Sequence, residues 1–162
     1  MVVDSSPCLL VEGADAPLMS ALTAGAASRG YRILVDGEGD DVPPLAGALH
    51  FSSGSRSSSL EAAVAAGPTL AFRFLRRTVA RLAEGAAVVL VAGSVGEDAP
   101  HLRVADEALL GLARAAAEDL RSRGIRVRCL GRGEEADADS LAAAVLDAVV
   151  GPDLLGGLRV LL

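Results

Sequence analysis

The sequence contains no lysine, asparagine, glutamine or tryptophan, and it has a single tyrosine, Tyr31. No site on this chain can therefore use a lysine ammonium group or a carboxamide side chain. The two cysteines, Cys8 and Cys129, lie in separate apolar runs, which is typical of buried thiols and provides neither a disulfide framework nor a cysteine-rich zinc site. The few aromatic residues offer little surface on which nucleic-acid bases could stack.

Charge and hydrophobicity narrow the class of protein further. The net charge is −6 at pH 7, which disfavours attraction to nucleic acids and anionic membranes. No apolar run approaches the ~20 residues that span a bilayer, and the amino-terminal stretch has no basic region typical of a signal peptide. At 162 residues the chain fits one domain, 1–162. We therefore expect a cytoplasmic, single-domain protein without a metal centre, a nucleic-acid partner or a membrane anchor.

Apolar runs and helical segments alternate along the chain. Strands are predicted at 7–13, 31–36, 47–51, 86–93, 125–130 and 158–162. Helices are predicted at about 16–29, 59–84 with a bend at Gly67–Pro68, 102–123 and 139–150. About six strands alternating with helices predict an α/β fold with a doubly wound, Rossmann-like parallel sheet.

Four stretches carry a resemblance to a known family. They are LLVEGADAPLMSALTAGAASRGYRILVD (9–36), GAAVVLVAGS (85–94), ALLGLARAAAEDLRSRGIRV (108–127) and LAAAVLDAVVGPDLLGGLRVLL (141–162). In order and spacing they resemble the short-chain dehydrogenases/reductases, and in particular the 3-oxoacyl reductases, over nearly the whole chain. That family usually has a helix, a strand and another helix where this sequence has ten residues after Asp36. We therefore expect a shortened sheet that lacks one edge strand.

The resemblance implies a nucleotide site at EGADAPLM (12–19), on which the family's pattern TGxxxGxG falls. Gly13 matches the pattern, whereas Glu12, Pro17 and Met19 replace the threonine and the other two glycines. In the family those glycines let the backbone approach a pyrophosphate at the helix N-terminus. Side chains at these positions are expected to fill that space.

Two further acidic residues bear on the same site. Asp15 is a predicted N-cap, and a capping carboxylate would occupy N–H groups that a phosphate would otherwise use. Asp36 matches the acidic residue that holds the ribose in members of the family that prefer NAD. The remaining match is weak, so we expect a degenerate nucleotide site and no bound cofactor.

The family's catalytic residues fall on positions that cannot perform their roles. The resemblance places the catalytic tyrosine at Leu102 and the lysine at Asp106, the helix asparagine near Ala65, and the serine at Ser94. In the family the tyrosine exchanges a proton with the carbonyl oxygen, and the lysine lowers the pKa of the tyrosine. Leucine has no proton to give, and an aspartate would raise the pKa of a neighbouring acid. We therefore expect no catalytic residues and no activity as a dehydrogenase alone.

A hydrolase provides an alternative interpretation of one loop. AGSVGEDAPH (92–101) brings Ser94 and His101 together with two acidic residues after a predicted central strand. A nucleophile elbow, however, needs the serine on a tight turn into a helix, and no helix begins there. The loop is more typical of solvation and capping, and His50, within a strand, is predicted to be a packed core residue.

The helix predicted at 102–123 has a wider apolar arc than a helix needs when only one of its sides is buried against a sheet. Arg103, Glu107, Arg114, Glu118 and Arg121 form one charged stripe, and the remainder is mostly alanine, leucine and valine. Alanine can simply be a good helix former on the surface, but a helix-packing interface is the sharper interpretation.

The resemblance points to the same helix, because the family assembles through the helices matching 59–84 and 102–123 across a twofold axis. A second interface in the family matches 141–162, whose terminal strand would otherwise be an exposed edge. The predicted interface residues are Phe72, Arg73, Arg76, Arg77, Ala105, Leu109, Leu112, Ala116, Leu120, Leu158 and Val160.

Arginines gather on the helix predicted at 59–84, although the chain as a whole is acidic. Arg73, Arg76, Arg77 and Arg81 lie on roughly one face. Such a run is usually a solvated face, but it could instead bind an acidic partner subunit, a carrier protein or the phosphates of coenzyme A.

Three hypotheses about function follow. The first is a noncatalytic short-chain-dehydrogenase-like subunit, a pseudoenzyme, that pairs with a catalytically active NAD(P)-dependent homologue in a heterodimer or heterotetramer. The second is a homo-oligomeric module that binds a ligand or docks a carrier protein. The third is a divergent enzyme whose reaction is not dehydrogenation.

Overall fold

The computed structural model describes residues 6–35, 44–53, 57–94, 99–133, 136–151 and 159–160. Six strands of these residues form one sheet in the order β2-β1-β3-β4-β5-β6, and every neighbouring pair is parallel. The strands are β1 (Cys8–Glu12), β2 (Arg32–Val35), β3 (Leu45–Phe51), β4 (Leu82–Ser94), β5 (Arg126–Arg132) and β6 (Arg159–Val160). The sequence-based prediction of a doubly wound parallel sheet is confirmed.

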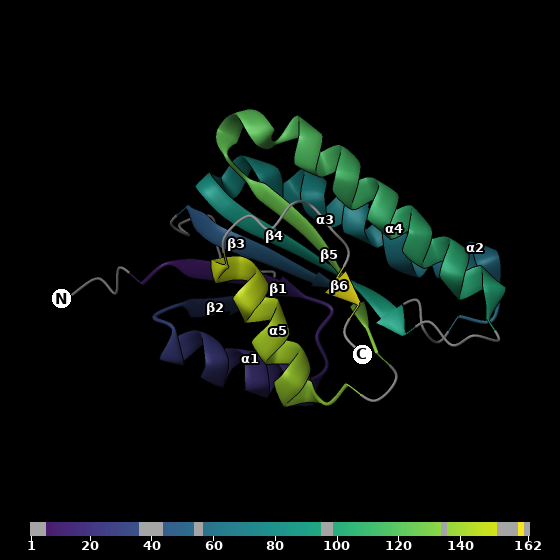
Figure 1. Ribbon diagram of the computed structural model, residues 1–162, viewed down its shortest axis with the longest axis horizontal. Helices are drawn as coiled ribbons and strands as arrows, with labels where there is room; N and C mark the ends of the chain where they lie inside the picture. Colours follow the sequence, from purple (N-terminus) through teal and green to yellow (C-terminus); the bar gives the residue numbers. More distant parts are fainter. Residues whose placement is uncertain are drawn as a thin grey trace.

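Helices cover both faces of this sheet (Figure 1). On one face lie α1 (Ala16–Ser28) and α5 (Ala138–Val150), which pack side by side. On the other face lie α2 (Leu60–Val64), α3 (Leu70–Thr78) and α4 (Pro100–Asp119). The sheet therefore separates two hydrophobic cores, as a buried parallel sheet requires.

The central strands explain why the sheet is buried on both faces. Val88, Val89, Leu90 and Val91 of β4 alternate between the two cores, and each is at most 2% exposed. A continuous β-branched and leucine-rich run is the pattern that a strand covered on both sides requires.

Both cysteines, Cys8 of β1 and Cys129 of β5, are buried and form no disulfide.

The helix predicted at 59–84 is interrupted and ends earlier than expected. A π-helical turn, η2 (Ala65–Thr69), contains Pro68 and joins α2 to α3, which confirms the predicted bend. A 3₁₀ turn, η3 (Val79–Arg81), closes α3, and β4 then begins at Leu82. The predicted end at residue 84 was wrong because Leu82 and Ala83 suit a helix as well as a strand. At Gly85 the φ angle is +75°, which no helix tolerates.

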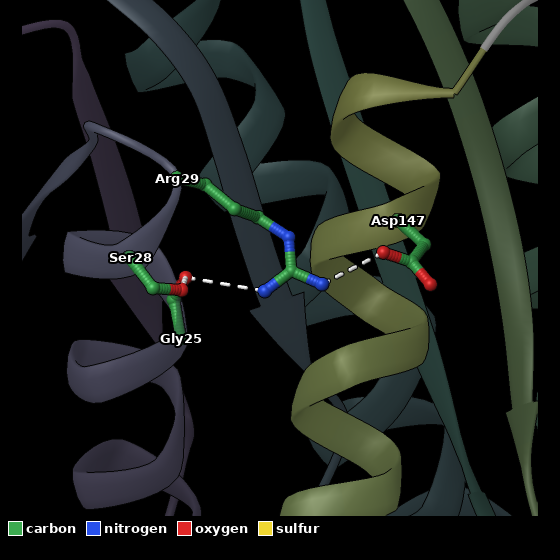
Figure 2. A network of polar contacts seen from close by, with 4 residues as sticks. All are labelled: Gly25, Ser28, Arg29 and Asp147. Atoms are coloured by element: carbon green, nitrogen blue, oxygen red, sulfur yellow. Dashed lines mark hydrogen bonds and ion pairs between the residues drawn. The ribbon is translucent and has the colours of Figure 1, made fainter.

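Arginines fasten helices to the rest of the fold. Arg126 of β5 donates to the carbonyls of Gly151 (2.6 Å) and Val149 (2.8 Å) at the end of α5. These carbonyls have no partner within the helix, so cationic donors stabilise that end. Figure 2 shows a second link, in which Arg29 after α1 donates to Asp147 of α5 at 2.8 Å and to the carbonyl of Gly25. No helix in the described part of the chain is long and apolar enough to cross a membrane.

Candidate functional site

The candidate site lies at the carboxyl ends of the strands, between β1 and β3. The helix that follows β1 covers one face of the sheet, and the helices that follow β3 cover the other. Ligands bind to doubly wound sheets at such a switch point. A cavity of about 330 Å³ opens here, and its lining includes Gly13, Asp15, Ser52, Ser53 and Arg132.

Gly13 has a structural role that is independent of any ligand. Its φ angle is +82°, a conformation that favours glycine. A Cβ atom at Gly13 would lie 2.2 Å from the carbonyl oxygen of Phe51, at the end of β3. Packing of the first βα turn against β3 therefore requires this glycine, so its match to the nucleotide pattern does not by itself indicate a cofactor.

The N-terminus of α1 is capped by the chain itself. The Asp15 Oδ1 atom accepts a hydrogen bond from the N–H of Leu18 at 3.1 Å, which confirms the predicted N-cap. Pro17 in the first turn contributes no N–H. The carboxylate of Asp15 thus stands where a phosphate would need free donors and low negative charge.

Met19 lies away from this cavity. Its side chain packs against the core beneath α1 and lines a separate groove of about 460 Å³, together with Tyr31 and Val35 beside the edge strand β2. Asp36, the predicted ribose ligand, lies outside the described residues. The residues of the nucleotide pattern therefore do not converge on one pocket among the described segments.

Glu12 points to the opposite face of the sheet from the cavity. Its carboxylate forms an ion pair with the guanidinium of Arg77 on α3, and its other oxygen lies 3.5 Å from Nδ1 of His50. The guanidinium carbon of Arg77 lies 5.7 Å from the centre of the Phe74 ring. Arg77, predicted as a partner-binding residue, thus joins the end of β1 to α3 within the chain.

His50 is buried as predicted, with 2% of its surface exposed, and its ring lies 5.3 Å from that of Phe74. Neither ring nitrogen has a hydrogen-bond partner among the described residues. Burial lowers the pKa of His50 to about 4, so the ring is neutral at pH 7.

The positions at which the resemblance places the family's tyrosine and lysine, Leu102 and Asp106, lie on α4. Leu102 is buried and packs against Ala63 of α2 and its own neighbour Ala105. The carboxylate of Asp106 accepts a hydrogen bond from the N–H of Gly93 near the end of β4. Burial raises the pKa of Asp106 to about 6, against the lowering effect of that hydrogen bond.

The positions at which the resemblance places the family's asparagine and serine are Ala65 and Ser94. Ala65 is exposed in the π-helical turn η2. Ser94 is the last residue of β4, and its side chain is not among those that the structure describes. Of the loop considered for hydrolysis, His101 has Nε2 2.8 Å from the carbonyl oxygen of Ser57. The acidic residues of that loop, 97 and 98, lie outside the described residues.

Cys129 on β5 is an inert thiol. Burial, together with the nearby charges of Asp106 and Glu107, raises its pKa to about 12. A thiol so protonated is neither a nucleophile nor a metal ligand at pH 7.

Several residues of the predicted partner surface are buried within the chain itself. Ala105, Leu109 and Leu120 are at most 8% exposed. Leu109 and Leu120 belong to the core between the helices and the sheet, and Ala105 packs with Ala63 of α2. Leu112 and Ala116 are also partly covered by that core. Residue 158 lies outside the described segments, and the side chain of Val160 in β6 is not described.

Other predicted interface residues do lie on the surface. Phe72 is 50% exposed on α3, and Arg73 and Arg76 are exposed beside it. On α4, Val104 is 51% exposed. Exposed apolar side chains therefore occur on both helices, and on α3 they lie beside exposed arginines.

Comparison with solved structures identifies the fold. A small-chain dehydrogenase matches 97% of this chain and 96% of its own at 14% identity, with a TM-score of 0.77. The enoyl-[acyl-carrier-protein] reductase (NADH) from Aquifex aeolicus VF5 matches 96% and 94% at 11% identity, with a TM-score of 0.75. An oxidoreductase of the short-chain dehydrogenase/reductase family from Brucella ovis, in complex with partially ordered NAD, matches 98% and 100% at 15% identity, with a TM-score of 0.70.

The chain therefore has the short-chain dehydrogenase/reductase fold in a shortened form of 162 residues. No protein-family model matches the sequence, and no curated protein matches it. At these identities the likeness establishes the fold, and the activity has to be argued from the site itself.

Proposed function

We propose that this chain is a noncatalytic subunit with the short-chain dehydrogenase/reductase fold, which pairs with a catalytically active NAD(P)-dependent homologue and stabilises or shapes it. The active subunit would supply the nucleotide, the tyrosine and the lysine. This chain would supply a rigid scaffold with helix faces for packing.

One observation carries the proposal: the carboxylate of Asp106 faces the end of β4 from α4, where the family that the sequence resembles uses a lysine. A carboxylate there cannot lower the pKa of an acid or hold a ribose by donating hydrogen bonds. The buried Leu102 and the capping Asp15 support the same conclusion, because one provides no proton and the other occupies the helix N-terminus.

The outer side of α3 is the surface we assign to the active partner. Phe72 provides an exposed apolar anchor, and Arg73 and Arg76 flank it with positive charge. Aromatic and arginine side chains are enriched at the centres of protein interfaces. The partner is expected to present acidic side chains around an apolar pocket.

Co-expression tests the proposal. The untagged chain is produced with a tagged homologue from the same genome that has intact TGxxxGxG and YxxxK motifs, and the complex is examined by pull-down and native mass spectrometry. We expect a stable mixed complex whose NAD(P)-dependent activity falls when this chain is omitted. A partner in which the catalytic tyrosine is replaced by phenylalanine should form the same complex without activity. Failure of the chains to associate, or residual activity in that variant complex, would contradict the proposal.

The cavity at the switch point favours a second candidate function, a homo-oligomeric ligand-binding module. Arg132 and the two serines, Ser52 and Ser53, could bind a small anionic group in about 330 Å³. Thermal unfolding of the chain alone would test this alternative, because a ligand that binds only the folded state raises Tm. An increase that disappears in Arg132→Ala would support it.

A further inference from the structure

We infer that the outer edge of β2 binds a second copy of this chain, with the two β2 strands antiparallel across a twofold axis at Leu34. The contact would join the sheets of the two copies into one continuous sheet. This inference goes beyond the proposed function, which assigns the outer side of α3 to an active homologue. The backbone of β2, its side chains and the groove beside it all support this contact.

The outer edge of β2 has no strand beside it among the described residues. β2 is the first strand in the order of the sheet and pairs on one side only, with β1. The family that the sequence resembles has a further strand at this point. Here nine residues, 36–44, separate β2 from β3. That is too few for a crossover to another parallel strand, which needs about a dozen residues or more.

β2 lacks most of the features that keep an edge strand from pairing. Natural edges are commonly protected by a proline, a bulge or an outward charge. β2 contains no proline, and its register with β1 is continuous, whereas the pairings of β1 with β3, β3 with β4 and β4 with β5 each shift. The one charged residue of β2, Arg32, turns towards β1, where its Nη2 atom donates to Sγ of Cys8 at 3.3 Å. The edge is therefore regular and mostly apolar.

The outward backbone groups of β2 suit antiparallel pairing about Leu34. The N–H of Arg32 donates to the carbonyl of Pro7 at 3.0 Å, so it points towards β1. Because backbone groups alternate in direction along a strand, those of Ile33 and Val35 point to the free edge. If Ile33 lies opposite Val35 of the second copy, the two residues exchange both of their N–H···O hydrogen bonds. The twofold axis repeats this pair and places Leu34 opposite its own copy.

The same register matches apolar side chains on both faces of the sheet. Ile33 packs against the core on the α1 face, and Leu34 belongs to the core on the other face. Opposite residues of an antiparallel pair point to the same face, so Val35 of one copy meets Ile33 of the other on the α1 face. A shift by one residue would destroy this match. Val35 is 50% exposed in the single chain, and the contact covers it.

A groove of about 460 Å³ lies between α1 and β2 on this face of the sheet. Its lining includes Met19, Thr23 and Ala27 of α1 together with Ile33 and Val35 of β2. Figure 1 shows α1 beside β2 at this edge. Thr23 and Ala27 are small and exposed, so they leave room for Val35 of the second copy. The contact therefore fills a groove that the single chain leaves open.

Edge substitutions test the contact, with the chain alone and its mass measured by sedimentation velocity. The wild type should dimerise. Val35→Pro removes an outward N–H but no hydrogen bond to β1, so it should weaken the dimer at least about tenfold while the chain stays folded by circular dichroism. Val35→Lys should have the same effect, because lysine protects edge strands from pairing. Val150→Lys, at a position 54% exposed on α5, is the matched control and should leave the dimer unchanged.

Disulfide formation tests the register. Ile33→Cys and Val35→Cys are prepared separately and mixed under mild oxidation. Opposite positions of a hydrogen-bonded pair have Cα atoms about 5.5 Å apart, which suits a disulfide. The mixture should therefore form a mixed disulfide, whereas Val35→Cys alone should form none, because the two copies of residue 35 lie out of register. The wild type, whose own cysteines are buried, is the blank.

Three results would overturn the inference: a monomeric wild type, a dimer that Val35→Pro and Val35→Lys leave unchanged, or the absence of the mixed disulfide. None of them bears on the association with an active homologue, because that contact uses the outer side of α3.

Discussion

The guanidinium of Arg77 on α3 forms an ion pair with the carboxylate of Glu12 at the end of β1. This pair lies beside the buried His50 and crosses from the sheet to the helix layer. It uses an arginine that the sequence alone presents as one of four surface arginines. The relationship therefore separates the arginines that hold the fold from those that are available to a partner.

Replacing Arg77 with alanine should destabilise the chain by about 1–2 kcal/mol, because Glu12 would remain half-buried without its cation. Arg76→Ala is the matched control, since Arg76 is exposed on the same helix, and its effect should be within about 0.5 kcal/mol. Urea unfolding measures both free energies. Equal effects of the two substitutions would show that the Glu12 pair contributes nothing specific.

His50 should make the fold sensitive to acid. Its pKa is about 4 in the folded state and 6.5 when unfolded, so the unfolded state binds more protons between these values and stability falls as pH falls from 6.5 to 4. His50→Leu should remove this loss, which is worth roughly 3 kcal/mol. The measurement is the difference in unfolding free energy between variant and wild type as a function of pH. A difference that stays constant from pH 8 to pH 4 would contradict the assignment.

Asp106 should act in the opposite direction. Its pKa is about 6 in the folded state and 3.8 when unfolded, so its burial costs stability above pH 6 and the cost disappears as pH falls towards 3.8. We expect Asp106→Asn to be more stable than the wild type by about 1–2 kcal/mol at pH 8, after allowance for solvent screening. The gain should vanish near pH 4 in thermal or urea unfolding. A variant that is less stable than the wild type at pH 8 would indicate that the charged form is favoured.

The two glycines with positive φ around α1 should respond differently to substitution. Gly13→Ala should cost about 3 kcal/mol or more, because its Cβ would overlap the carbonyl oxygen of Phe51. Gly30→Ala should cost only about 1 kcal/mol of backbone strain, since no atom lies within 4 Å of the added carbon. Chemical unfolding of both variants gives the comparison. Similar costs would mean that the first βα turn can move away from β3.

Much of the fold is predictable from the sequence, because apolar periodicity and glycine stops are local signals. The β-branched run of β4, the cap Asp15 and the bend at Pro68 all appear as predicted. The start of β4 at Leu82 was missed because helix and strand patterns overlap there.

The candidate site was harder to predict, since its contacts join residues far apart in the sequence. The pairing of Glu12 with Arg77 depends on which side of β1 the glutamate faces, and no local pattern determines that. Ala105, Leu109 and Leu120, predicted at an interface, are buried within the chain, because helix periodicity alone does not tell which apolar arc of a helix is covered by its own fold. The alternation of Glu12 with Val11, which lies in the other core, could have indicated the side.

Counting nucleotides in the mixed complex tests the central claim most directly. Native mass spectrometry of the complex with its active homologue, at saturating NADH or NADPH, resolves the number of nucleotides bound for each composition of subunits. We predict one nucleotide for each copy of the active homologue and none for each copy of this chain. A nucleotide bound to this chain alone, or one for every subunit of the complex, would contradict the account.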